Sequence, residues 1–164
     1  MKNMITEVST SDAIQITAIY NYYVRESVAT FDTEEWNVEK MSERIQSLSS
    51  SYPYLVYRTP EGNIAGYCYV HPWKEKDAYS RTHETTVYIS PEYTGKGIGK
   101  ALMEELISIC RKRNYLALIA CITEGNESSF KLHERLGFER VSHFKKVGMK
   151  FGRYLDVIDY ELIL

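Results

Sequence analysis

The fold is decided by the stretch Val87-Tyr88-Ile89-Ser90-Pro91-Glu92-Tyr93-Thr94-Gly95-Lys96-Gly97-Ile98-Gly99-Lys100-Ala101-Leu102. Its first three residues are strand formers, and Pro91 cannot continue a sheet ladder. After the glycines, apolar side chains recur every three or four residues, as they do on one face of a helix. The stretch therefore predicts a strand, a glycine-rich turn and a helix from about residue 97 to residue 113.

Three glycines in this turn, Gly95, Gly97 and Gly99, stand at alternate positions. Because glycine has no Cβ, the backbone can turn tightly and expose its N–H groups. These groups lie at the positive end of the helix macrodipole, where anions bind favourably. Lys96 and Lys100 add positive charge nearby. The turn is therefore predicted to hold a phosphate or pyrophosphate group.

The spacing excludes two common phosphate-binding motifs. A P-loop would need glycine at position 94 and Ser or Thr at position 101, where this chain has Thr94 and Ala101. A dinucleotide fingerprint that begins at Gly95 would need a third glycine at position 100, which is a lysine. From the turn alone, an ordinary structural turn without a ligand stays an alternative to a phosphate site.

The composition indicates a globular protein with one core. The chain has 164 residues, 44% of them hydrophobic, and its net charge of -2 argues against a dedicated nucleic-acid binder. No apolar run approaches the length of a membrane span, and residues 1–3 are expected to lead into a strand rather than a signal peptide. The cysteines Cys68, Cys110 and Cys121 form no metal-type pair. They are expected to be reduced core residues of a cytoplasmic protein.

The rest of the chain alternates between strand and helix patterns. Ser11 and Asp12 can cap a first helix, and Asn37 can cap a second. Residues 116–122 are nearly all apolar, as in a strand that is buried on both faces. Predicted strands cover about residues 5–8, 54–57, 64–71, 82–89, 116–122, 140–147 and 154–164. Predicted helices cover about residues 12–25, 38–48, 97–113 and 127–136.

With this order of elements, the chain resembles the GNAT superfamily of N-acetyltransferases over essentially its whole length. The acyl-CoA pyrophosphate loop of that superfamily has the form Gln/Arg-x-x-Gly-x-Gly/Ala, and residues 94–99 match it except at Thr94. The resemblance implies one α/β domain, residues 1–164, with a single mixed, mostly antiparallel sheet of six to seven strands and about four helices. It also implies acetyl-CoA as cosubstrate, bound less tightly because Thr94 replaces the usual polar or cationic residue.

The resemblance assigns further residues to acetyl-CoA. In the superfamily, the fourth and fifth strands separate and leave main-chain groups free for pantetheine and the acetyl carbonyl. A backbone N–H near Val87 or Tyr88 is therefore the expected oxyanion donor. No metal is expected. The expected acetyl-CoA contacts are Val87, Tyr88, Ile89, Thr94, Gly95, Lys96, Gly97, Ile98, Gly99, Lys100, Asn126 and Ser129.

Two residues are candidates for the proton transfers that amide formation requires. Glu84 lies in an otherwise uncharged strand, where a carboxylate either faces solvent or has a partner or a role. Its segment, Thr-x-Glu-x-x-Val-Tyr, resembles the phosphinothricin acetyltransferase-like branch, in which this glutamate is the proposed general base. Residues 126–138 resemble the family segment Asn-x-x-Ser-x-x-x-His/Tyr-Glu-x-x-Gly-Phe, whose His or Tyr protonates the thiolate. His133 holds that position, although it could equally be a packing residue.

The acceptor site is expected from the same branch, which usually carries arginines after a Pro-Trp pair. This chain has Lys74 and Lys76 instead, and lysine supplies charge without the planar fork of arginine. The aromatic candidates could wall a pocket, although tyrosine-rich faces are more often core. The expected acceptor contacts are Tyr20, Phe31, Trp73, Lys74, Lys76, Tyr79 and Arg81.

The sequence thus predicts an acetyl-CoA-dependent N-acetyltransferase for a small amino-acid-like amine, such as phosphinothricin, methionine sulfoximine or methionine sulfone. The basic residues Lys74, Lys76 and Arg81 favour a small anionic acceptor, while a polyamine or a protein N-terminus stays an alternative. A non-catalytic acyl-CoA-binding domain is a third reading, against which Glu84 and His133 argue. The family suggests a homodimer, and no nucleic-acid or membrane partner is expected.

Overall fold

The computed structural model describes residues 4–164, so the expected lead at residues 1–3 lies outside the described residues. The α-helices are α1 (Ala13–Glu26), α2 (Val38–Ser49), α3 (Ile98–Lys112) and α4 (Glu127–Arg135). The strands are β1 (Ile5–Glu7), β2 (Tyr54–Arg58), β3 (Ile64–Pro72), β4 (Thr82–Ile89), β5 (Ala117–Thr123), β6 (Glu139–Lys150) and β7 (Arg153–Ile163). Short 3-10 turns cover Thr10–Asp12, Asp77–Tyr79 and Pro91–Tyr93.

The strands of residues 4–164 form one seven-stranded sheet in the order β1-β2-β3-β4-β5-β7-β6. Neighbouring strands pair antiparallel, except that β4 and β5 pair parallel, with α3 as the crossover between them. The predicted fold class is therefore confirmed: a mixed, mostly antiparallel sheet with four α-helices. The predicted chain order of strands and helices is confirmed as well.

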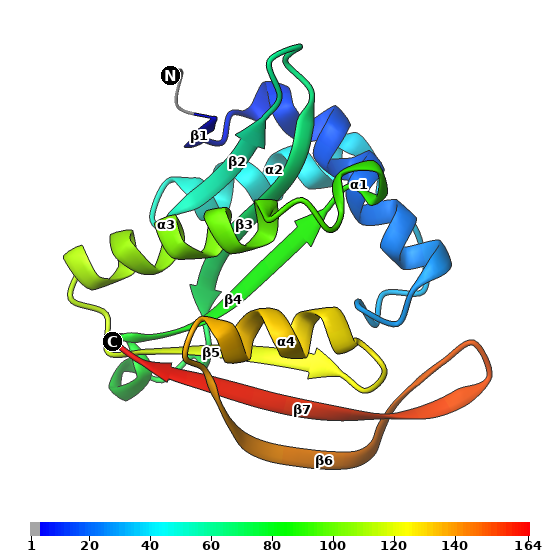
Figure 1. The fold of residues 1–164 in the computed structure, drawn as a ribbon, viewed down its shortest axis with the longest axis vertical. Coiled ribbons are helices and arrows are strands. Elements are labelled where there is room, and N and C mark those ends of the chain that lie inside the picture. Colours follow the sequence, from blue (N-terminus) through cyan, green and yellow to red (C-terminus); the bar gives the residue numbers. More distant parts are fainter. Residues whose placement is uncertain (1–3) are drawn as a thin grey trace.

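The helices cover the two faces of the sheet (Figure 1). On one face, α1 and α2 bury Ile16 and Ile45 against Tyr67 of β3. On the other face, α3 packs Leu102 and Leu106 into a larger cluster, against which apolar side chains of α4 also pack. Burial of these side chains at about 25 cal/mol per Å² holds the three layers together.

The helix starts agree with the sequence in one case and differ in another. Asn37 caps α2 as predicted, because its Oδ1 accepts the Lys40 N–H at 2.8 Å. For the first helix, Asp12 stands at the N-cap position of α1 as predicted, but its side chain makes no capping hydrogen bond to α1. Ser9 caps the preceding 3-10 turn, in a capping box in which the Asp12 carboxylate accepts the Ser9 N–H at 2.8 Å.

The parallel pairing of β4 with β5 is short, and this shapes the site. The ladder joins Thr82 to Ala117 and ends at Glu84, opposite Ile119. Beyond that pair β4 continues to Ile89 and β5 to Thr123, while each strand keeps its other neighbour. The two strands diverge in a V, visible between the green and yellow arrows of Figure 1. The separation of strands that the resemblance implied is therefore present.

Candidate active site

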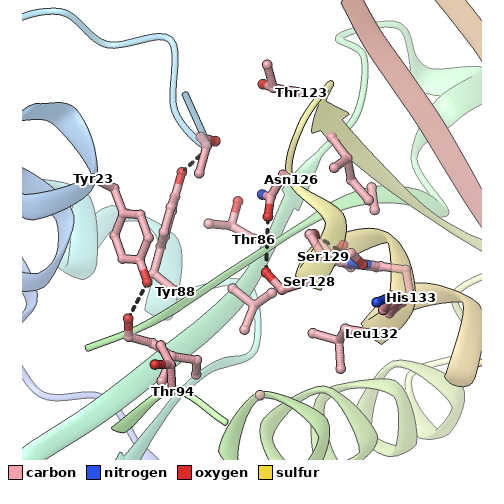
Figure 2. Close-up of a pocket in the computed structure, with 18 of the residues that line it drawn as sticks. Tyr23, Thr86, Tyr88, Thr94, Thr123, Asn126, Ser128, Ser129, Leu132 and His133 are labelled. Atoms are coloured by element: carbon pink, nitrogen blue, oxygen red, sulfur yellow. Dashed lines mark hydrogen bonds between the residues drawn. The ribbon is translucent and has the colours of Figure 1, made fainter. Parts of the chain in front are cut away.

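A cavity of about 870 Å³ occupies the V between β4 and β5. It is walled by both strands, the glycine turn and one side of α4. Figure 2 shows Tyr23 and Tyr88 on one side, Asn126, Ser129 and His133 on the other, and Thr86 between them. Both Glu84 and the glycine turn line the cavity, so it reaches from the predicted phosphate site to the predicted base.

The glycine turn has the backbone that its sequence requires. Gly95 and Gly97 have φ angles of 74° and 79°, in the left-handed region that side chains with a Cβ rarely adopt. Gly97 is the N-cap of α3, which begins at Ile98 as predicted. Apart from their own chain neighbours, no atom of residues 4–164 lies within 4 Å of the position that a Cβ would take at Gly95 or Gly97. The unpaired N–H groups of the first helical turn therefore face an open space that suits an anion.

The side chains around the turn contribute differently from what their sequence suggests. The Thr94 hydroxyl donates to the Pro91 carbonyl at 3.1 Å, so it closes the preceding turn. Lys96 lies 5.1 Å from the Tyr93 ring centroid, and Lys100 pairs with Glu104 at 3.6 Å. Two cations that sequence reasoning missed, Lys131 and Arg135, also line the cavity. Their spacing of four residues on α4 is the signal that places both on one helix face.

Glu84 lies where the two strands part. Its carboxylate is 3.8 Å from Nε2 of His71, the residue that faces it on β3. The alternation of side chains puts Cys121 on the same sheet face as Glu84, because Cys121 follows Ile119 by two residues. Glu84 is thus half-buried at the end of the cavity, next to a histidine and a thiol.

Cys121 differs from the expectation that all three cysteines are core residues. Cys68 and Cys110 are buried, whereas Cys121 is exposed and lines the cavity. Desolvation raises the pKa of the Cys121 thiol, and the carboxylates of Glu84 and Asp159 raise it further. The thiol therefore stays protonated at neutral pH. Its place follows from strand alternation within an apolar run, a pattern that does not tell a cavity wall from a core.

His133 lines the cavity from α4 and is 3% exposed. Its Nδ1 lies 2.7 Å from the carbonyl oxygen of Ser129, which accepts a hydrogen bond from the Nδ1–H. The ring also meets Phe138 edge-on at 5.0 Å. Burial lowers the pKa of His133, so the neutral ring dominates at neutral pH and its Nε2 carries no proton. The role of proton donor stays a prediction, and this arrangement weighs towards packing.

The other predicted cofactor residues line the cavity as a group. Asn126 precedes α4, and its Oδ1 accepts from the Ser128 hydroxyl at 3.3 Å. The Ser129 hydroxyl lies 3.3 Å from Nδ1 of His133. Of the predicted set, the cavity lining contains Val87, Tyr88, Ile89, Thr94, Gly95, Gly97, Ile98, Gly99, Lys100, Asn126 and Ser129.

Tyr23 of α1 is a wall residue of the large cavity that sequence reasoning missed. Its hydroxyl donates to the carbonyl of Ile89, at the end of β4 (Figure 2). Its ring lies 5.1 Å from that of Tyr88, whose hydroxyl donates to the Ala29 carbonyl at 3.4 Å. These contacts tie α1 to the free edge of β4 and fix the side of the cavity opposite α4.

The predicted acceptor residues fall into three places. Phe31 lines the large cavity, and its ring packs on Gly148 of β6, where a Cβ would overlap it. Tyr20 lines a second cavity of about 250 Å³ between α1, α2 and the sheet. The residues of the connection between β3 and β4 line neither cavity: Trp73, Lys74, Lys76, Tyr79 and Arg81.

The connection between β3 and β4 has internal contacts instead. Trp73 and Tyr79 meet edge-on at 5.4 Å, and the Lys74 ammonium lies 4.3 Å from the Trp73 ring centroid. The Arg81 guanidinium donates to the carbonyl of Asn114, at 2.9 Å from Nε. Arg81 thus ties the start of β4 to the end of α3. Its predicted contact with the acceptor stays a prediction.

Two further searches concern the described residues alone. Among residues 4–164, no three His, Cys, Asp or Glu side chains come together as a metal site. In the same part of the chain, no helix is both long and apolar enough to cross a membrane. The expectation that no metal takes part stays a prediction.

The cavity, the glycine turn and Glu84 at its end suit an acyl-CoA-dependent transferase, and comparison with known proteins agrees. The model of the acetyltransferase (GNAT) domain matches residues 5–158, so the chain belongs to the GNAT acetyltransferase family. Members of this family are enzymes that transfer an acetyl group to an amine.

Similar proteins indicate which branch of the GNAT family this chain resembles. The chain is 38% identical over 153 residues to a phosphinothricin N-acetyltransferase of Streptomyces coelicolor, with 92% of this chain and 90% of that protein covered. It is 35% identical over 159 residues to an L-methionine sulfoximine/L-methionine sulfone acetyltransferase of Salmonella typhimurium, with 94% and 90% covered. A phosphinothricin acetyltransferase of Sinorhizobium meliloti, solved with acetyl-CoA, superposes with a TM-score of 0.95 at 34% identity and covers 100% of this chain and 89% of its own.

Proposed function

We propose that this protein transfers the acetyl group of acetyl-CoA to the amine of a small amino-acid-like acceptor of the phosphinothricin, methionine sulfoximine or methionine sulfone type. The observation that carries the proposal is the position of Glu84, half-buried where β4 and β5 part and at the end of a cavity that begins at the glycine turn. The names of the similar proteins supply the acceptor class. Residues 1–164 act as one acetyltransferase domain in this proposal.

The residues present fit acetyl-CoA. The glycine turn at Gly95 and Gly97 offers main-chain donors and an open approach to the pyrophosphate, with Lys96, Lys131 and Arg135 as nearby cations. The β4 edge beyond Glu84 offers main-chain groups for the pantetheine and for the acetyl carbonyl oxygen. When bound, acetyl-CoA supplies a thioester that an amine can attack.

Glu84 is the proposed general base. Acetyl transfer needs an uncharged amine, and an acceptor ammonium must therefore lose a proton before attack. The Glu84 carboxylate can take this proton directly or through one water molecule, and His71 at 3.8 Å can hold the carboxylate in place.

His133 is proposed to return a proton to the CoA thiolate. Because its Nδ1–H is held by the Ser129 carbonyl, only a protonated Nε2 could donate, and burial makes the imidazolium rare. We therefore expect His133→Phe to lower kcat by about tenfold or less, below the 10²- to 10⁴-fold that a dedicated acid provides. A larger loss in pre-steady-state CoA release would restore the role of main acid to His133.

Glu84→Gln tests the proposed function. The variant should keep the acetyl-CoA affinity of the wild type, while kcat for the acceptor falls by roughly 10²- to 10⁴-fold. The loss should be largest at low pH, where nearly all of the acceptor amine is protonated. Calorimetry with acetyl-CoA and thiol-release kinetics across pH measure the two quantities.

Glu61→Gln is the matched control, because Glu61 is an exposed glutamate in the hairpin turn between β2 and β3. It should behave as the wild type in both measurements. Wild-type turnover in Glu84→Gln at every pH would move proton removal to another group and remove the main support for this site.

We also propose a cytoplasmic homodimer. Exposed apolar side chains gather on the hairpin of β6 and β7 and support a subunit contact there: Val141, Phe144, Val147, Met149, Phe151 and Tyr154. Three free cysteines support a reducing compartment. Sedimentation of the wild type against Met149→Lys checks the dimer, since a charge at that contact should yield monomers.

A further inference from the structure

The second cavity, of about 250 Å³, lies between α1, α2 and the sheet, next to the large one. Its walls are mostly aromatic, and its two charged residues are Asp32 and Arg44. A wall of Tyr20 and Tyr88, with ring centroids 5.5 Å apart, stands between it and the large cavity. The residues that line the second cavity are Tyr20, Asp32, Trp36, Met41, Arg44, Tyr54, Tyr67 and Tyr69.

The Asp32 carboxylate is bound by other groups of the protein. Its carboxylate accepts from the Tyr20 hydroxyl and, at 3.0 Å, from Nε1 of Trp36. Burial lowers the pKa of Lys150, and Asp32 partly offsets that shift. The Lys150 ammonium itself donates to the carbonyls of Ser27 at 2.6 Å and Thr30 at 2.8 Å. Asp32 therefore holds the loop after α1 and balances a buried cation.

Arg44 is different. It lies on α2, with its guanidinium carbon 5.8 Å from the centroid of the Tyr69 ring. Within residues 4–164, no carboxylate lies within 4.0 Å of it, whereas Arg25 and Arg58 both have carboxylate partners. The second cavity thus presents one cation without an ionic partner in the described part of the chain, beside an aromatic wall. This combination suits an anionic group on a small organic ligand.

Contacts along one sheet face connect Arg44 with Glu84. Tyr69 and His71 are two residues apart on β3, so their side chains lie on the same face of the sheet, the face that α1 and α2 cover. Their rings are 6.1 Å apart, and Nε2 of His71 lies 3.8 Å from Glu84. In the β3–β4 register, Tyr69 faces Thr86, which lines the large cavity. The second cavity therefore borders the end of the large cavity where Glu84 lies.

We propose that Arg44 binds the acidic oxygens of the acceptor, which lies across Tyr69 and His71 with its amine at Glu84. This inference rests on the proposed function and adds the group that selects an anionic acceptor. A guanidinium can bind two oxygens of a carboxylate or phosphinate side by side, which a lysine cannot do. Arg44 would thus do what Lys74 and Lys76, which line neither cavity, are not placed to do in this chain.

Arg44→Gln tests the proposal, with phosphinothricin, methionine sulfone and the α-amide of each as acceptors. Loss of a charge-assisted pair should raise KM by roughly ten- to hundredfold for acceptors that keep the bound acid group, with kcat nearly unchanged. Arg44→Lys should restore part of the affinity. The acetyl-CoA affinity should equal that of the wild type, since Arg44 does not line the large cavity.

The amides tell which acidic group is bound. If Arg44 binds the α-carboxylate, the effect of Arg44→Gln disappears with both amides. If it binds the distal group, the effect persists with the amides and is larger for the charged phosphinate than for the uncharged sulfone. Equal KM for Arg44→Gln and the wild type with all four acceptors would overturn the proposal.

Lys40→Gln is the matched control. Lys40 is one turn earlier on α2, does not line the second cavity, and lies over the Trp36 ring at 3.8 Å. An equal rise in KM for Lys40→Gln would show an effect of overall charge and overturn the specific contact.

Calorimetric titration of methionine sulfone, in the presence of CoA, separates this inference from the proposed function. If the wild type acetylates no acceptor but binds the sulfone, and Arg44→Gln loses that binding, the function fails and the Arg44 site stands. If the wild type acetylates and Arg44→Gln matches it, the Arg44 site fails and the function stands. A wild type that binds no amino-acid ligand overturns both.

Discussion

Single glycines shape the turns of the chain, because they have φ angles that residues with a side chain rarely adopt. Gly97 caps α3 with φ of 79°, and Gly62 turns the hairpin between β2 and β3 with φ of 88°. In the described part of the chain, no atom beyond the adjacent residues lies within 4 Å of a Cβ at either position. A substitution at either position therefore strains the backbone without a steric clash. The two positions differ in their surroundings, since Gly97 lines the large cavity and Gly62 lies in a hairpin turn away from it.

Gly97→Val should cost stability and also acetyl-CoA affinity. A β-branched residue in the left-handed region costs of order 1–3 kcal/mol, and the new side chain occupies the approach to the main-chain donors. Gly62→Val should cost similar stability and leave the acetyl-CoA affinity unchanged. Thermal unfolding and calorimetry measure both quantities, and wild-type affinity in Gly97→Val would mean that the turn is not the pyrophosphate cradle.

Gly148→Ala should weaken binding of the acceptor and leave binding of acetyl-CoA unchanged. A Cβ at position 148 overlaps the Phe31 ring, so the ring must move from its place in the cavity wall. We expect KM for the acceptor to rise several-fold, with acetyl-CoA affinity nearly unchanged. The double variant with Phe31→Leu should be no worse than Phe31→Leu alone, because the smaller side chain relieves the overlap. Additive losses would show that Gly148 acts independently of Phe31.

At the scale of elements, the short β4–β5 ladder and the helix α4 build the two walls of the site. The ladder ends at Glu84, so the strand that carries the proposed base also carries a free edge. Helix α4 contributes His133 and Ser129 to the opposite wall, and His133 is bonded to the carbonyl one turn earlier. The proposed base Glu84 is thus on the sheet, and His133 is on a helix of nine residues.

Burial of His133 makes the fold sensitive to acid. Its pKa is lowered in the folded state, so at mildly acidic pH the unfolded chain binds more protons than the folded one. The contribution of neutral His133 to the free energy of unfolding is therefore fully present above about pH 6.5, the ordinary pKa of histidine. It falls as the pH drops towards the lowered pKa of the folded state. Burial lowers the pKa of His83 too, which adds to the same trend.

Thermal unfolding between pH 7 and pH 5 checks this prediction. The Tm of the wild type should fall over that range, by roughly 2–4 °C for each kcal/mol lost. His133→Asn should have a lower Tm at pH 7 and a weaker dependence on pH. An unchanged pH dependence would show that His133 does not carry the effect.

Much of this architecture is predictable from the sequence, for local reasons. Asn37 caps α2, and most of the apolar run of residues 116–122 forms the largely buried strand β5, because capping and burial act within a few residues. The short 3-10 turn before α1, capped by Ser9, was not predicted, because Ser9, Ser11 and Asp12 all have side chains that suit a cap.

The candidate site is predictable only where a motif fixes the backbone. The glycine turn and Glu84 lie at the cavity as expected, since both belong to one continuous strand and turn. Cys121 and Arg44 escaped prediction because their places depend on which strands part and which helix covers the face. Arg81 was predicted to contact the acceptor, but its guanidinium donates to the carbonyl of Asn114. This partner is distant in the sequence, so the sequence pattern did not reveal it.

At the scale of the whole molecule, the protein is a sheet opened on one side between two helical layers. The α1–α2 layer supplies the second cavity and Arg44, and α3 and α4 supply the cradle and the far wall. Glu84 lies where these parts meet. We therefore propose that a small anionic amino acid and acetyl-CoA meet at Glu84.

Acetyl-CoA-dependent thiol release tests that claim most directly. The acceptors are phosphinothricin, methionine sulfoximine, methionine sulfone, ordinary amino acids and spermidine, with an enzyme-only blank because Cys121 is exposed. The account predicts release with phosphinothricin, methionine sulfoximine or methionine sulfone, none with spermidine, and at least a 10²-fold loss in Glu84→Gln. Acetyl-CoA binding without release for any amino acid, or release with spermidine alone, would contradict it.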